Sequence, residues 1–109
     1  MRGKNQNLDV EANQNVVEWL KADLVESVSA LFRSLFRVSS EATADALSTI
    51  IITCYILARR VGINYQSIDM QIMHKINGSI SDVYEIEQMY GDLTELKNYL
   101  ERKENKKRC

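Results

Sequence analysis

Apolar residues recur at steps of three and four after a polar N-terminal stretch, which predicts a helix that begins at Asn13 or Asn15. The members of this apolar face are Val16, Leu20, Leu24, Val28, Leu31 and Leu35. Five more apolar residues widen the face: Val17, Trp19, Val25, Phe32 and Phe36. A helix that is apolar around so much of its circumference is expected to pack against several neighbours or a partner subunit.

A second helix is expected from Ser39 or Ser40 to about Val61, because serine caps helix starts and Gly62 suits the position after a helix end. Residues 46–58 within it form the most apolar run of the chain. The run is shorter than the ~20 residues that a membrane span needs. We therefore expect a buried helix and no membrane partner.

Three shorter helices are expected after the second one, at about residues 65–77, 81–90 and 93–104, with glycines at the breaks between them. The predicted inner side of the first of these carries Ile68, Ile72, Met73 and Ile76. The pattern predicts an all-α fold, a helical bundle of four to five helices. Its single domain covers residues 13–104, between a segment 1–12 that is expected to be disordered and a basic tail 105–109.

The composition supports a helical protein of the reducing cytoplasm. The 109 residues include no proline and four glycines, and the formal net charge of −1 gives no case for nucleic-acid binding. Cys54 lies in the apolar run and Cys109 is the last residue, so we expect a buried free thiol and a tail thiol. No secretory pattern follows the first residues, and a cytoplasmic location is expected.

Two pairs of acidic residues lie one turn apart on the first two predicted helices. Asp23 and Glu26 are separated by roughly 60° around one helix, and Glu41 and Asp45 by about 40° around the next. If the two helices pack antiparallel, the pairs can converge. Mg²⁺ takes such hard oxygen ligands, so a divalent metal site is one prediction.

A second interpretation of these carboxylates needs no metal. Glu41 is a routine acidic residue in a first helical turn, where negative charge is favoured. Asp23 and Glu26 can face solvent, and Asp45 can pair with Arg33 or Arg37. Spacing alone leaves both interpretations open.

The order of these features resembles the MazG-like family, in the all-α nucleoside triphosphate pyrophosphohydrolase superfamily, over residues 16–100. Asp-Leu-Val-Glu at 23–26 is similar to part of the family's Glu-Glu-x-x-Glu motif, and residues 41–47 resemble its Glu-x-x-Asp motif. Ala-Arg-Arg-Val-Gly-Ile at 58–63 looks like the family's helix end. Residues 86–93 are similar to a stretch in a short, divergent bacterial branch.

The chain also departs from the family's acidic motifs. Ala22 stands where the first motif begins with Glu, and Asp23 replaces the next Glu. Ala42 occupies the place of the Glu three residues before Asp45, leaving Glu41 one position earlier. At least one metal ligand is missing or substituted. The resemblance therefore implies a slow or specialised enzyme, or one that has lost its activity.

For a working site, the resemblance implies Mg²⁺, or Mn²⁺, and a nucleoside triphosphate substrate. The implied metal ligands are Asp23, Glu26 and Asp45. Water activated at the metal would attack the α–β linkage, and Glu41 would orient or deprotonate that water. Lys75 and Asn77 are the loosely spaced counterparts of the family's nucleotide contacts. The products would be a nucleoside monophosphate and pyrophosphate.

Two functions remain as hypotheses. The first is a Mg²⁺-dependent nucleotide pyrophosphohydrolase, or a weakened descendant of one, in which Asp45→Asn abolishes turnover. The second is a catalytically inert MazG-like module that acts through oligomerisation or through binding of nucleotide or protein. Both predict a homodimer or homotetramer, since the resemblance implies an obligate helical assembly and the apolar surface needs covering.

Overall fold

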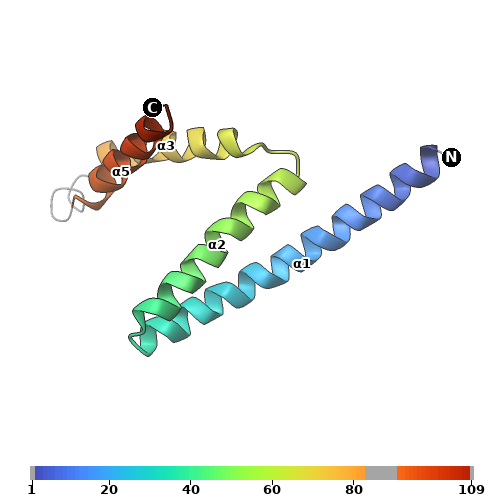
Figure 1. Cartoon of the computed structure of the whole chain (residues 1–109), viewed down its shortest axis with the longest axis horizontal. Coiled ribbons are helices and arrows are strands. Elements are labelled where there is room, and N and C mark those ends of the chain that lie inside the picture. Colours follow the sequence, from blue (N-terminus) through green and yellow to red (C-terminus); the bar gives the residue numbers. More distant parts are fainter. Residues whose placement is uncertain (1, 83–90, 109) are drawn as a thin grey trace. The chain divides into compact units, whose positions relative to one another are not determined.

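The computed structural model describes residues 2–82 and 91–108, and the described residues fold as helices without a strand (Figure 1). The helices are α1 (Arg2–Phe36), α2 (Ser40–Arg60), α3 (Tyr65–Asp82) and α5 (Asp92–Arg108). They belong to two compact units, residues 1–65 and 66–109. The predicted all-α fold is confirmed. Most of the helix expected at 81–90 lies outside the described residues.

α1 and α2 form an antiparallel hairpin in the first unit (Figure 1). Its buried seam carries Leu20, Ser27 and Ser34 on α1, and Ala46 and Thr53 on α2, each set spaced by seven residues. A seven-residue spacing keeps side chains along one line of a helix that faces a single partner. Four of these five side chains are small, which lets the two helices approach closely.

The apolar face predicted for α1 is only partly buried in the single chain. Leu20 is buried, Leu35 is exposed, and the other four members are half-buried. The cause is the position of the seam on α1. The side of α1 that faces α2 passes through Ser27 and Ser34, so the centre of the apolar face lies beside the contact with α2 and not within it.

The ends of α2 follow local chemistry, as predicted. The backbone N–H of Ala42 donates to Oγ of Ser39 over 3.2 Å, so Ser39 is the N-cap. At the other end Gly62 has φ +91°, with N–H bonds from Gly62 to the carbonyl of Arg59 (3.1 Å) and from Ile63 to that of Ala58 (2.8 Å). This pair of bonds is a Schellman motif.

Three other helix boundaries differ from the predictions. α5 ends at Arg108 and not near residue 104, so it includes most of the predicted basic tail. α1 begins at Arg2 and not at Asn13 or Asn15. α3 continues through Gly78 to Asp82, because a glycine inside a helix costs only about 1 kcal/mol and does not force a break. The predicted inner side of α3 is confirmed: Ile76 is buried, and Ile68, Ile72 and Met73 are half-buried.

The prediction that α2 is a buried helix is wrong for the single chain. Leu47, Ile51 and Ile52 are exposed, and the thiol residue Cys54, also expected to be buried, is exposed. A hairpin covers only the side of each helix that faces its partner. By length and composition alone α2 is long and apolar enough to cross a membrane. Core helices of soluble proteins meet the same two criteria.

Candidate acidic site

Asp23 is half-buried on α1 and faces α2 across the hairpin. Oγ1 of Thr53 donates a hydrogen bond to Oδ2 of Asp23 over 3.3 Å, and Thr53 is only 3% exposed. The carboxylate therefore accepts a bond from the neighbouring helix and keeps part of its surface in water. Its second oxygen is available for another donor or a cation.

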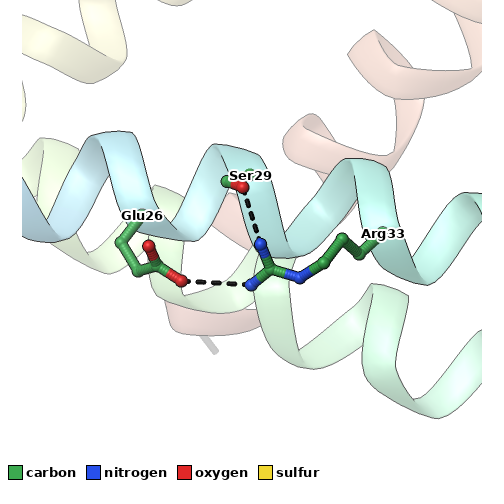
Figure 2. A network of polar contacts seen from close by, with 3 residues as sticks. All are labelled: Glu26, Ser29 and Arg33. Atoms are coloured by element: carbon green, nitrogen blue, oxygen red, sulfur yellow. Dashed lines mark hydrogen bonds and ion pairs between the residues drawn. The ribbon is translucent and has the colours of Figure 1, made fainter.

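Glu26 lies on the outer surface of α1 in an ion pair. Nη2 of Arg33 is 3.1 Å from Oε1 of Glu26, and Nη1 of Arg33 donates to Oγ of Ser29 over 2.7 Å (Figure 2). The side chains of Glu26 and Arg33 are 71% and 54% exposed. An exposed pair contributes about 0–1 kcal/mol, so it would give up Glu26 to another partner at little cost.

Glu41 and Asp45 are both exposed near the start of α2. Glu41 lies in the first turn, as expected. Within the described residues neither carboxylate has a hydrogen bond or ion pair, so the alternative pairing of Asp45 with Arg33 or Arg37 is not observed there. Both carboxylates face solvent and are free to bind an added cation.

The register of the hairpin sets the two acidic pairs at different heights. Thr53 lies opposite Asp23, and Asp45 precedes Thr53 by eight residues, which is about 12 Å along α2. The contact of 2.8 Å between the hydroxyls of Ser34 and Thr43 supports the same register near the turn. The helices are antiparallel, as the metal hypothesis requires, but their register keeps Asp23 and Asp45 apart.

The described residues of one chain therefore do not fit a bound Mg²⁺ ion. Mg²⁺ holds its oxygen ligands at about 2.1 Å, far less than the axial offset between the acidic pairs. No three His, Cys, Asp or Glu residues in 2–82 and 91–108 come together as a group that could hold a metal. The predicted ligands Asp23 and Glu26 can therefore share a cation with Asp45 only when that Asp45 belongs to a second chain.

The sequence profile of one protein family matches residues 10–93, which include both acidic pairs and the end of α2. The chain belongs to the MazG-like family. The match is to the family as a whole and does not identify a bacterial branch. No curated protein and no solved structure matches the chain at a significant level.

The two residues that the MazG-like resemblance suggested as nucleotide contacts lie on α3. Lys75 and Asn77 are both exposed and belong to the second unit, whereas the acidic pairs belong to the first. His74, next to them, is also exposed. The role of Lys75 and Asn77 in nucleotide binding stays a prediction.

A pocket of about 480 Å³ in the first unit was not predicted. It is lined by Asn13, Ile56, Arg59, Arg60 and Tyr65. The resemblance placed the two arginines only in the MazG-like helix end at residues 58–63. The two consecutive arginines indicate positive charge at the end of α2. Asn13 lies 46 positions before Arg59, so no local sequence pattern predicts that Asn13 lines the same pocket.

Proposed function

We propose that this MazG-like chain is a nucleotide pyrophosphohydrolase-type module of weakened activity that works as an assembly of copies in the cytoplasm. Its reaction would convert a nucleoside triphosphate to the monophosphate and pyrophosphate. The observation that carries the proposal is the family match, because it spans both acidic segments and the hairpin that presents them. The substituted motif positions Ala22 and Ala42 account for the weakened activity.

Assembly is supported by an apolar strip on α1 that the hairpin leaves uncovered. Val25, Phe32 and Phe36 are 71%, 64% and 90% exposed. At 100° per residue they fall within about 40° of one another around the helix. A contiguous apolar strip of this kind marks an interaction surface. We assign it to a second copy of the chain, in a homodimer or homotetramer.

The proposed cofactor is Mg²⁺, or Mn²⁺, held by carboxylates from more than one chain. Asp45 and Glu41 are solvent-facing and unpaired within the described residues, and Glu26 is held only by an exposed ion pair. These carboxylates are accessible to a neighbouring chain. Lys75 and Asn77 remain the proposed contacts to the nucleotide.

A second function is favoured by the register of the hairpin. Since Asp23 and Asp45 are offset by about 12 Å, a module without a cation site would fold in the same way. In this alternative the chain is a catalytically inert MazG-like module. It acts through oligomerisation or through binding of nucleotide or protein.

Calorimetric titration of Mg²⁺ and Mn²⁺ into the purified chain, with and without a non-hydrolysable triphosphate, tests the first function. We expect metal binding that is lost in Asp45→Asn and kept in Glu101→Gln, which removes an exposed carboxylate from α5. Release of pyrophosphate should likewise be lost in Asp45→Asn and kept in Glu101→Gln. A folded, oligomeric protein with neither metal binding nor turnover would contradict the hydrolase and support the inert module.

A further inference from the structure

Among the described residues, those that line the pocket at the C-terminal end of α2 include two arginines and no acidic residue. Within the described residues, the side chain of Arg59 forms no hydrogen bond or ion pair. Both arginines line the pocket and bring positive charge to it. A pocket with this charge and no acidic partner in its lining is suited to a negatively charged ligand.

The arginines are not needed to cap the helix. The carbonyls of Ala58 and Arg59 accept backbone bonds from Ile63 and Gly62, and that of Arg60 accepts a bond of 3.1 Å from Nδ2 of Asn13. The negative partial charge at a helix end resides on its unpaired carbonyls. With these carbonyls bonded, both guanidinium groups remain available to a ligand, and the end of α2 repels an anion less.

Asn13 also orients one of the two guanidinium groups. Nη1 of Arg60 donates to Oδ1 of Asn13 over 3.3 Å, while the amide of Asn13 donates to the carbonyl of Arg60. This reciprocal pair of bonds joins α1 to the end of α2. A guanidinium group has five N–H donors, so four remain for a ligand after the bond to Asn13. Because the bond to Asn13 already restrains the side chain of Arg60, this side chain loses less conformational entropy on ligand binding than an unrestrained arginine would.

The lining of the pocket also includes one aliphatic and one aromatic residue, Ile56 and Tyr65. The ring of Tyr65 packs edge-on against Tyr55, with centroids 5.8 Å apart and an interplanar angle of 86°. This packing holds the ring of Tyr65 beside the arginines. The volume of about 480 Å³ lies within the range of small-molecule sites.

We propose that this pocket binds a small anion that carries phosphate groups, with Arg59 and Arg60 as its main contacts. Arginine matches phosphate because its planar fork donates two parallel hydrogen bonds. The phosphates can belong to an inorganic polyphosphate or to the tail of a nucleotide whose base lies against Ile56 and Tyr65. Arg59 follows Asp45 by fourteen residues, about 21 Å along α2, so this site does not depend on the proposed hydrolase.

The test is calorimetric titration of sodium tripolyphosphate and of ATP into the full chain, in EDTA and at matched ionic strength. EDTA removes divalent cations, so binding here is independent of any metal held by the acidic residues. We expect both ligands to bind and Arg59→Gln to weaken each by about tenfold or more. Arg37→Gln is the matched control, because it removes an exposed arginine outside the pocket and should change affinity less than about twofold.

Two further variants separate the sources of the phosphate and guard against misfolding. Tyr65→Leu should lower ATP affinity selectively if a nucleotide is the ligand, and should leave both affinities unchanged if the phosphates alone are recognised. Asn13→Ala should weaken both ligands while Arg59 stays in place. Absence of binding up to about 10 mM ligand, or equal affinities of Arg59→Gln and Arg37→Gln, would overturn the proposal.

Discussion

Thr53 on α2 donates a hydrogen bond to Asp23 on α1, and the two residues lie at the same height of the hairpin. This relationship determines what the acidic residues can do together. It pairs Asp23 with a hydroxyl and not with another carboxylate. A cation that binds Asp23 and Asp45 at once must therefore be shared between chains.

Replacement of Thr53 by valine should lower the free energy of unfolding by about 1 kcal/mol, because it removes the donor to Asp23 at a buried position. Urea denaturation measures the change. Thr49→Val is the matched control, since within the described residues the hydroxyl of Thr49 bonds only to the carbonyl of Asp45 in its own helix. The control should change stability by less than about 0.5 kcal/mol. Equal effects of the two variants would show that the cross-helix bond contributes nothing.

Val38 is strained in the turn between α1 and α2. Its φ is +55°, and its N–H bonds to the carbonyl of Leu35, as in the glycine position of a Schellman motif. This backbone conformation costs a β-branched residue about 1–3 kcal/mol. Val38→Gly should therefore raise the free energy of unfolding by about 1 kcal/mol after the added flexibility of glycine in the unfolded chain is subtracted.

Thermal unfolding of Val38→Gly and Val61→Gly tests this account. Val61 occupies the cap of α2 with an ordinary φ of −98°, so glycine there brings only the entropic cost and should destabilise the chain. Val38 is 87% exposed, so its removal sacrifices little buried surface. If both variants destabilise the protein equally, the strain at Val38 is not real.

The caps of α2 could be predicted from the sequence because each acts within a few residues. Ser39 bonds to the third residue after it, and Gly62 allows a positive φ at its own position. The inner side of α3 could be predicted for a similar reason, since the spacing of isoleucines sets an angle around one helix.

The hairpin seam and the acidic site could not be predicted in the same way. Periodicity gives the angle of a residue around its helix and says nothing of its height relative to a partner helix. That height depends on the turn between the helices, where Val38 adopts a positive φ that no residue preference signals. Ser34 and Thr53 are buried in the seam and each bonds to a residue of the other helix, Thr43 and Asp23, which no local pattern indicates.

The ion pair between Glu26 and Arg33 should contribute little to stability. Glu26→Gln is expected to change the free energy of unfolding by less than about 1 kcal/mol, because both side chains are exposed and the attraction is screened by water. Denaturation at low and high salt measures the effect, which should shrink as salt is added. A loss above about 2 kcal/mol would indicate that Glu26 is buried against a second chain.

The apolar strip of Val25, Phe32 and Phe36 should hold the assembly together. The double variant Phe32→Ser/Phe36→Ser should shift the protein towards monomers in sedimentation velocity, at concentrations where the unmodified chain is oligomeric. Burial of a phenylalanine side chain contributes roughly 1.5–3 kcal/mol, so losing two from each chain should raise the dissociation constant by more than about a hundredfold.

Met70→Ser is the matched control for the apolar strip, because Met70 is an exposed apolar residue on α3. Its removal should leave the oligomer intact. Phe36 is 90% exposed in the single chain, so its replacement costs the fold of one chain little, and circular dichroism should show unchanged helicity in the double variant. An unmodified chain that sediments as a monomer would contradict the proposed assembly. A double variant that remains oligomeric would show that the apolar strip is not the interface.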